Sequence, residues 1–334
     1  MKCIDKAQAG LLLIVSLLFQ HSATSQMTAG AEYQVSVQRG IVYGQGLVIK
    51  ENKKVNRELW LDAYLPDKPQ SGPLAAVIYT HGGSFHIGSP RTAFTVDGAI
   101  TDSPEDYCRL FASLGYACFA IQYRLGSEEP IASGKGYSEE VVNRESIKLM
   151  MDRVAIIRSN LNLRPLDINS EQDKALIADT VLSAAEDLKK ALDYITDNAK
   201  SFNVDTKKIV LGGFSAGAVT SLNVAHGLNA PVAGVFMLSA APIGFDIFKT
   251  VSTTSNSSPA LLFTGQYDLA GAITSFEGLI THYSNAGLDF SYAWVPAFGH
   301  FYPSGAVSLG GDGTRLSVRE RVTQFVARVT TVAD

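Results

Sequence analysis

The sequence contains little cysteine, no long apolar segment and no block of like charge. Three cysteines among 334 residues exclude a scaffold held by many disulfides and a cysteine-rich metal site. The apolar run at residues 11–19 is much shorter than the roughly 20 residues that span a bilayer. A net charge of −4 without basic patches argues against nucleic acid or an anionic membrane surface as a partner. We therefore expect neither nucleic acid binding nor stable membrane insertion of the mature chain.

The first 25 residues have the pattern of a secretory signal peptide. Lys2 and Lys6 precede the apolar run, and residues 23–25, Ala-Thr-Ser, offer small side chains where a signal peptidase cleaves. The alternative is an uncleaved anchor or a buried helix. With cleavage near Ser25 and Gln26, we expect a secreted or periplasmic protein. Residues 26–334 are expected to form a single domain, because no linker or repeat divides them.

Two cysteines remain after removal of the signal peptide. Cys108 falls in a predicted helix over 107–114, and Cys118 falls in a predicted strand over 117–122. An oxidising compartment favours a disulfide between them. Two buried free thiols fit the sequence equally well, so the pairing stays open at this point.

The most informative segment is residues 213–217, Gly-Phe-Ser-Ala-Gly, which fits the G-x-S-x-G pattern of a nucleophile elbow. It follows the apolar run 209–211 and precedes a predicted helix. At such a turn the hydroxyl of Ser215 projects from the end of the sheet, and glycine on either side removes clashes with neighbouring backbone. The N–H groups of the following helix favour a developing negative charge. The alternative is a glycine-rich turn that only packs.

A nucleophilic serine needs a base, and three histidines follow Ser215. His226 lies about three turns further along the predicted helix, too far to reach the serine. His282 lies inside a helix predicted over 273–284. His300 lies in a loop after the strand predicted over 290–295, where a side chain can turn toward the serine. We predict that His300 is the base, the alternative being a surface histidine.

The residue that orients the base is expected between the serine and the histidine in chain order. Asp268 fits best, because it closes a turn immediately after the apolar run 260–264. Its alternative role is an Asx-turn. Asp246 and Asp289 are weaker candidates, one after the preceding strand and one before the following strand.

Donors for the oxyanion are expected from Ala216 and from the loop 81–85, His-Gly-Gly-Ser-Phe, which follows a predicted strand over 75–80. We expect the side chain of His81 to hydrogen-bond the backbone and hold this loop rather than to transfer protons. No cysteine or carboxylate cluster accompanies His81 and His86, so no metal is expected.

Strand and helix patterns alternate along the chain, as in a doubly wound α/β fold. An antiparallel pair of strands is predicted first, over 41–50 and 57–65. Six parallel strands follow, at 75–80, 117–122, 209–211, 234–239, 260–264 and 290–295. Apolar residues at helical spacing predict a long helix over 181–199 and a last helix over 318–329. We expect a mostly parallel sheet of about eight strands with helices on both faces.

Four features together resemble the α/β-hydrolase superfamily: the His-Gly-Gly at 81–83, the elbow, Asp268 and His300. More narrowly, they are similar to serine carboxylesterases related to hormone-sensitive lipase and to small secreted acetyl and feruloyl esterases. The segments 61–66, 122–125 and 185–187 support the likeness, which spans about residues 42–329.

The resemblance implies an α/β-hydrolase fold and ester hydrolysis through an acyl-enzyme, with no cofactor. It implies a triad of Ser215, His300 and Asp268, and an oxyanion hole of backbone N–H groups from Gly83, Ser84 and Ala216. Ser84 departs from the pattern, because many relatives have a third glycine there.

About sixty residues between Leu125 and Ala185 exceed what a minimal fold of this kind needs. A helical insertion is predicted at about 126–180, because apolar residues recur there at helical spacing. These residues are Ile147, Met150, Met151, Val154, Ile157 and Leu161. One possibility is that the insertion caps the pocket for the acyl or alcohol group. The alternative is that it covers apolar surface at the periphery or forms a dimer contact. Phe85, Phe214 and Phe301 are spaced to line an apolar mouth of the site, the alternative being that any of them belongs to the core.

The sequence therefore predicts a secreted serine carboxylesterase acting on small-molecule esters with short acyl, small aromatic or sugar groups. An amidase or peptidase on the same fold is an alternative, because identical triads cleave amides. A non-catalytic binding module is a third possibility, and the complete candidate triad argues against it.

Overall fold

The computed structural model describes residues 33–67, 72–96, 99–167 and 169–331. The chain divides at Ala31, and the unit from Glu32 to Asp334 contains every described residue. The predicted signal peptide, with its cleavage position near Ser25, lies outside the described residues. Among the described residues, no helix combines the length and apolarity needed to cross a bilayer.

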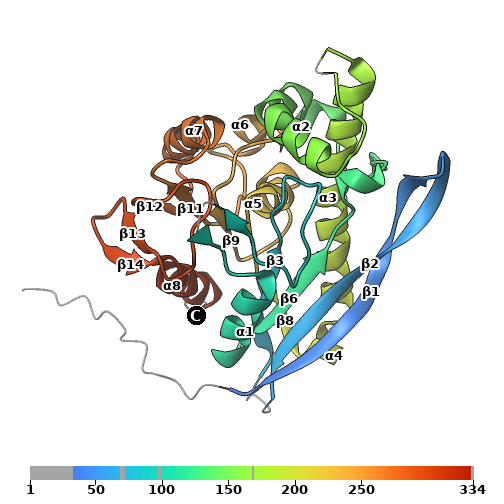
Figure 1. The fold of residues 1–334 in the computed structure, drawn as a ribbon. Helices are drawn as coiled ribbons and strands as arrows, with labels where there is room; N and C mark the ends of the chain where they lie inside the picture. The colour runs from blue at the N-terminus through green and yellow to red at the C-terminus, as the bar shows by residue number, and fades with distance from the viewer. Residues whose placement is uncertain (1–32, 68–71, 97–98, 168, 332–334) are drawn as a thin grey trace, which may run out of the picture. The chain divides into compact units, whose positions relative to one another are not determined.

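A ten-stranded sheet runs through this unit (Figure 1). Its strand order is β1-β2-β6-β3-β8-β9-β11-β12-β13-β14. The six strands from β6 to β12 pair in parallel, and two strands at each edge pair antiparallel. The strands are β1 (Val35–Lys50), β2 (Lys53–Pro66), β3 (Leu74–Thr80), β6 (Ala117–Gln122), β8 (Val204–Phe214), β9 (Gly234–Leu238), β11 (Ala260–Gly265), β12 (Phe290–Val295), β13 (Val307–Gly310) and β14 (Arg315–Ser317).

The sheet confirms the predicted antiparallel pair and all six predicted parallel strands. The last two strands, β13 and β14, were not predicted, so the expected number of about eight was too low. Each has four residues or fewer, which is too short for an alternating pattern to stand out.

Helices cover both faces of the sheet, as predicted (Figure 1). Side chains of α3, α5 and α7 pack on one face, and those of α1 and α8 pack on the other. The helices are α1 (Pro104–Ser113), α2 (Met151–Asn160), α3 (Glu171–Asp197), α4 (Ala199–Phe202), α5 (Ala216–Leu222), α6 (Ile247–Thr250), α7 (Ala270–Ala286) and α8 (Val318–Thr330).

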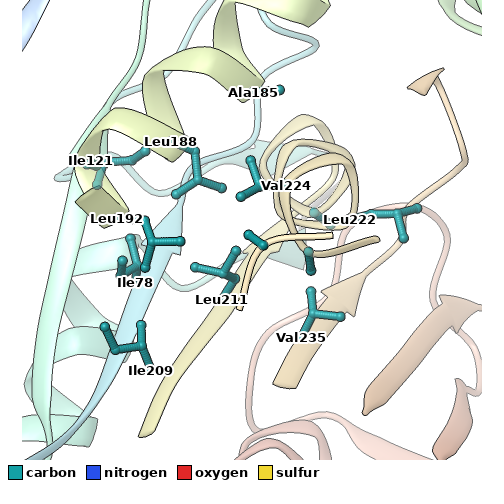
Figure 2. Packing of buried hydrophobic residues seen from close by; sticks show 14 of the residues in the cluster. Ile78, Ile121, Ala185, Leu188, Leu192, Ile209, Leu211, Leu222, Val224 and Val235 are labelled. Atoms are coloured by element: carbon teal, nitrogen blue, oxygen red, sulfur yellow. The ribbon is translucent and has the colours of Figure 1, made fainter. Parts of the chain in front are cut away.

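Consecutive residues of the central strands point to opposite faces, and both sets are buried. Ile78 and Leu211 contribute to the face covered by α3, where Leu188 and Leu192 meet them (Figure 2). Val77 and Val210, each one position earlier, belong to the core on the α1 and α8 side. Burial on both faces explains why these strands appear in the sequence as short continuous apolar runs.

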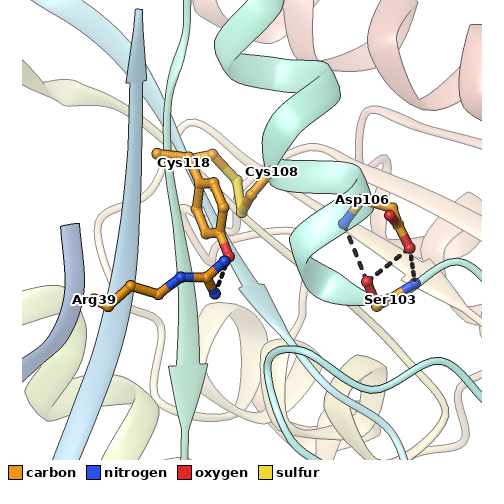
Figure 3. Close-up of a disulfide and its surroundings, with 6 residues drawn as sticks. Arg39, Ser103, Asp106, Cys108 and Cys118 are labelled. Atoms are coloured by element: carbon orange, nitrogen blue, oxygen red, sulfur yellow. Dashed lines mark hydrogen bonds between the residues drawn. A yellow bond between two sulfur atoms is a disulfide. The ribbon is translucent and has the colours of Figure 1, made fainter. Parts of the chain in front are cut away.

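A disulfide joins Cys108 of α1 to Cys118 of β6 (Figure 3), so the pairing left open by the sequence is settled. Both side chains are fully buried. Helix α1 begins with a capping box in which Ser103 and Asp106 exchange hydrogen bonds through side chain and backbone. The cap stabilises the first turn of α1, and the disulfide joins the helix to β6.

The region predicted as an insertion contains three short 3₁₀ helices, η1 (Gly126–Glu128), η2 (Glu139–Val141) and η3 (Arg144–Met150), followed by α2. Its strand β7 (Val142–Asn143) pairs with β10 (Gly244–Phe245) outside the main sheet, and β4 (Thr95–Val96) pairs with β5 (Ala99–Ile100). Its last ten residues, expected within the insertion, form the first turns of α3. The earlier start follows from Ser170, whose hydroxyl caps α3 by accepting a hydrogen bond from the Asp173 N–H.

A buried ion pair closes the base of this region. The Arg124 guanidinium donates to both carboxylate oxygens of Asp187, at 2.9 and 2.8 Å, and lies 3.3 Å from Glu186. Glu186 in turn accepts hydrogen bonds from the backbone N–H groups of Ser133 and Gly134. Segments 122–125 and 185–187, which the sequence analysis set apart, therefore meet at the two ends of the insertion.

Candidate active site

Ser215 stands at a sharp turn between β8 and α5, as the elbow pattern predicts. Its backbone has φ 53° and ψ −119°, a conformation that is strained for a residue with a side chain. The turn is held by the Ser215 N–H, which donates to Leu238 O at 2.8 Å. A Cβ on Gly217 would lie 2.0 Å from Thr80 O, and one on Gly213 would lie 2.5 Å from the Gly217 carbonyl carbon. The steric reason predicted for both glycines is confirmed.

Replacing Gly217 by alanine is therefore expected to destabilise the fold by about 3 kcal/mol or more and to reduce activity strongly. The added methyl would meet backbone atoms of β3 and the loop after it, which cannot swing away. Urea unfolding and an ester assay measure both effects. Gly278→Ala, within helix α7, is the matched control, because a Cβ there would meet only the ring of Phe248, with Cζ at 3.7 Å and Cε1 at 4.0 Å. The control is expected to stabilise the protein by up to about 1 kcal/mol. Equal effects of the two substitutions would contradict the steric argument.

His300 lies between Ser215 and Asp268 within hydrogen-bond distance of both. Its Nε2 is 2.8 Å from Ser215 Oγ, and its Nδ1 is 2.5 Å from Asp268 Oδ1. Ser215 follows β8, His300 follows β12 and Asp268 follows β11. The carboxyl ends of these parallel strands meet at one edge of the sheet. With the Nδ1 proton donated to Asp268, the Nε2 lone pair faces the serine hydroxyl.

Asp268 is buried and accepts hydrogen bonds on both of its oxygens. Oδ1 accepts from His300 and from the Leu269 N–H at 2.7 Å, and Oδ2 accepts from Ser239 Oγ at 2.6 Å and the Gly265 N–H at 3.2 Å. Burial alone raises the pKa of this carboxyl, but the hydrogen bonds from His300, Ser239 and Leu269 outweigh burial and hold the pKa below its ordinary value. The carboxylate is therefore ionised throughout the neutral range.

Ser239 and Tyr302 form a chain of hydroxyl groups behind Asp268 that the sequence analysis did not assign. Ser239 follows β9 with a left-handed φ of 58°, and its Oγ lies 3.0 Å from the Tyr302 hydroxyl. Because the single proton of Ser239 goes to Asp268, the Tyr302 hydroxyl donates to Ser239. The only available signal in the sequence was a serine at the end of a predicted strand.

The loop after β3 lies against the elbow. A Cβ on Gly82 would lie 3.3 Å from Ser215 Cβ. Gly83, Ser84 and Phe85 all have positive φ, so the chain turns tightly here. Ser84 and Ala216 line a cavity with Ser215, whereas Gly83 is not among the lining residues. Because α5 begins at Ala216, the N–H groups of its first turn have no acceptor within the helix.

The cavity beside Ser215 has a volume of about 80 Å³ and a mainly apolar wall. Phe85 lines it, as predicted. Phe214 and Phe301 do not line it and pack instead against the imidazole of His300, with ring centroids 5.7 and 5.1 Å away. The remaining lining residues are Ser84, Leu149, Met150, Arg153, Ser215, Ala216, Val219, Ser239, Ala241, Ile243, Leu269, Gly271, Ala272 and His300.

Each of the other histidines that the structure describes hydrogen-bonds to a group other than Ser215. His81 is buried, donates to Gly82 O at 2.7 Å and stacks on Tyr123, in line with the predicted structural role. His226 is bonded on both ring nitrogens, to Tyr283 and to Ser258 O. His282 lies 2.9 Å from Val251 O. Across the part of the chain that the structure describes, no group of three or more His, Cys, Asp and Glu side chains is placed to hold a metal.

Stability is expected to fall as the pH drops from about 6.5 to about 4. Burial lowers the pKa of His81, His86 and His226 to about 4, whereas an unfolded histidine titrates near 6.5. In that window the unfolded chain binds protons that the folded chain does not, so the free energy of unfolding decreases by up to about 3 kcal/mol per histidine. Above pH 6.5 all three are neutral in both states and contribute no slope.

Melting temperature measured from pH 7 to 4.5 tests this expectation. His226→Gln should reduce the pH dependence of the melting temperature by the contribution of one proton, whatever the variant's melting temperature at pH 7. A melting temperature independent of pH in this window would contradict the assignment of buried neutral histidines.

The rival carboxylates are placed elsewhere. Asp289 is exposed and forms a surface ion pair with Arg328 at 2.6 Å. Asp246 precedes the short helix α6, and its carbonyl accepts from the Thr250 hydroxyl. The structure brings neither of them to His300, so Asp268 is the carboxylate that meets the imidazole.

Comparison with known proteins gives one short family match and a broad structural likeness. A family model described as BD-FAE matches residues 174–232, which include the elbow. No curated protein sequence matches the chain significantly. Esterase 2 of Thermogutta terrifontis phosphoramylated by tabun is similar with a TM-score of 0.55 and 15% identity, covering 90% of this chain and 96% of that one. The propionate-bound esterase from the same organism gives 0.53 and 16%, covering 91% and 96%. This likeness, together with the sheet order, shows that the chain has the α/β-hydrolase fold.

Proposed function

We propose that this chain is a serine carboxylesterase in which Ser215 attacks an ester carbonyl. One observation carries the proposal: His300 bridges Ser215 and Asp268 at the wall of a cavity. His300 takes the serine proton as Oγ bonds to the carbonyl carbon, and Asp268 holds the tautomer and stabilises the imidazolium. The BD-FAE match around the elbow and the esterases that share the fold support the same reaction.

The tetrahedral oxyanion is bound by backbone N–H groups of Gly83, Ser84 and Ala216. Placement of Ser84 and Ala216 on the cavity beside Ser215 supports this role. His300 then protonates the leaving alcohol as the C–O bond breaks, which leaves an acyl-enzyme on Ser215. A water that gives its proton to His300 attacks this ester, releases the carboxylic acid and restores the serine. No cofactor takes part.

The size of the cavity supports the proposed substrate class. A volume of about 80 Å³ with an apolar wall suits short acyl or small aromatic groups and sugar esters better than long chains. Leu149, Met150 and Arg153 belong to η3 and α2, so the insertion forms one wall of this cavity.

A substrate panel tests the activity. It comprises p-nitrophenyl esters from acetate to palmitate, feruloyl and acetyl-sugar esters, and an aryl amide. Hydrolysis is expected to peak at the short esters and to be far slower for the amide. Amide cleavage faster than ester cleavage would reassign the protein as an amidase. Absence of turnover on every member would leave a binding module.

A covalent label tests the nucleophile separately. Esterase 2 of Thermogutta terrifontis has been solved phosphorylated by paraoxon. We expect paraoxon to leave one diethylphosphoryl group on Ser215 of this chain, which peptide mass spectrometry locates. Labelling of another residue, or none, would contradict the assigned nucleophile.

We further propose that the protein is exported after removal of residues 1–25. The signal-like N-terminus and the disulfide between Cys108 and Cys118 support this, because disulfides persist in oxidising compartments. N-terminal sequencing of the protein recovered outside the cytoplasm is expected to start near Gln26. A mature chain that still begins at Met1 would contradict export by cleavage.

A further inference from the structure

We infer that Arg153 recognises a negatively charged group on the substrate, so that the preferred esters carry a carboxylate or a similar anion. The inference rests on the proposed esterase function and narrows its substrate class. Arg153 lies on α2 of the insertion and lines the same cavity as Ser215 and His300.

Arg153 is half-buried, yet within the described residues it makes no hydrogen bond, ion pair or ring contact. The other three arginines of the insertion are engaged. Arg144 pairs with Glu139, Arg164 pairs with Asp173, and Arg158 donates to Arg164 O at 3.0 Å. A guanidinium brings five N–H donors, and a site that leaves them unused is open to an anionic ligand.

The wall of the cavity contains no opposing charge. None of its lining residues is Asp, Glu or Lys, and Arg153 is its one permanently charged side chain. His300 is neutral when it accepts the serine proton. An anion entering this cavity therefore meets one fixed positive charge and no negatively charged lining residue. The ionised Asp268 lies behind His300 and outside the lining, and the apolar wall strengthens the attraction to Arg153 relative to open water.

The backbone that carries Arg153 is held in place. Val154 of α2 and Met150 of η3 belong to the same buried cluster as Ala216 and Val219 of α5, so the insertion and the elbow share one core. Arg158 NH1, further along the same helix, lies 3.5 Å from Nε2 of His86 in the loop after β3. A side chain on a fixed helix can position a substrate relative to Ser215.

The test compares charged and neutral esters of nearly equal shape. For an anion on the acyl half, monomethyl glutarate is compared with the methyl ester of glutaramic acid. For an anion on the alcohol half, the acetyl ester of glycolate is compared with the acetyl ester of glycolamide. We expect the wild-type full chain to favour the anionic member of at least one pair by about 10- to 100-fold in kcat/KM, the range for a hydrogen bond to a charged group.

Three variants assign the effect to Arg153. Arg153→Gln should abolish the preference, because it raises KM for the anionic ester by about 10-fold or more relative to KM for the neutral ester. Arg153→Lys should keep part of it, because the charge remains without the planar fork. Arg144→Gln is the matched control, since this exposed arginine of the same insertion does not line the cavity. It should leave kcat/KM unchanged for both the anionic and the neutral ester.

The outcomes separate the inference from the function it rests on. Hydrolysis of neutral esters without a preference for either anionic ester overturns the inference alone. A preference that survives in Arg153→Gln overturns it as well. Failure to hydrolyse any ester of the panel overturns the proposed function, and the inference with it.

Discussion

Replacement of Ser215 by alanine is expected to reduce kcat for ester hydrolysis by about 10⁵- to 10⁶-fold, as removal of a triad serine does elsewhere. Its Oγ is the hydroxyl that lies 2.8 Å from His300 Nε2. Two other serines line the cavity, but neither replaces it. Ser239 gives its proton to Asp268, and Ser84 has no hydrogen bond to His300 in the described structure. The residual rate is measured with a p-nitrophenyl ester on protein free of wild-type contamination.

The control for this variant is Ser221→Ala on the same helix. Ser221 is buried, and its Oγ has no hydrogen-bond partner in the described part of the chain. Its loss should leave activity intact and cost little stability, because no partner is left unsatisfied. Both variants are expected to keep the wild-type circular dichroism spectrum. If Ser215→Ala retained more than a few per cent of wild-type turnover, the nucleophile would have to be sought elsewhere.

Residues fixed by chain order and strand ends could be predicted from the sequence. Ser215, Asp268 and His300 each follow an apolar run, and parallel strands bring such positions to one edge of the sheet. The glycines at 213 and 217 were predictable for the same reason, since a turn between strand and helix leaves no room for a Cβ. Local sequence is enough in these cases because topology supplies the rest.

Residues defined by three-dimensional neighbours could not be predicted. Ser239 reaches Asp268 across 29 positions and Tyr302 across 63, and no local pattern marks either contact. Phe214 and Phe301 were expected on the cavity because they adjoin Ser215 and His300 in sequence. Adjacency does not say on which side of the imidazole a ring packs, and both pack away from the cavity.

The insertion shows the same limit. Helical spacing predicted most of its apolar face, because Val154 and Ile157 are buried, but Leu161 is exposed. The segment is nevertheless divided into a 3₁₀ helix and α2, and spacing alone could not place Arg153 at the cavity. That position depends on how the insertion packs into the buried cluster that it shares with α5, which is a matter of tertiary structure.

Substitution of Asp268 by asparagine is expected to lower kcat by up to about 10⁴-fold, as the same change does in a well-studied serine protease. If the amide NH₂ of the introduced asparagine faces His300, Nδ1 has to accept its hydrogen bond. The imidazole proton is then on Nε2. This proton would point at Ser215 Oγ, so Nε2 could not accept the proton of the serine hydroxyl. The hydrogen bonds that lower the pKa of Asp268 favour the anionic carboxylate, and an amide carries no such charge.

The environment of residue 268 also prevents a flip of the asparagine amide from restoring favourable hydrogen bonds. Oδ1 accepts from the Leu269 N–H and Oδ2 accepts from the Gly265 N–H, so either orientation sets the amide NH₂ against a backbone donor. Asp268→Asn should therefore lose stability as well as activity, and a melting curve measures that part. Asp289→Asn and Asp246→Asn are the matched controls, because neither carboxylate contacts His300. Each should keep activity within about two-fold, since the ion pair of Asp289 is exposed and Asp246 forms no ion pair within the described residues. If a control lost the activity and Asp268→Asn kept it, the acid of the triad would have to be reassigned, and the hydrogen bond from His300 to Asp268 would have no catalytic role.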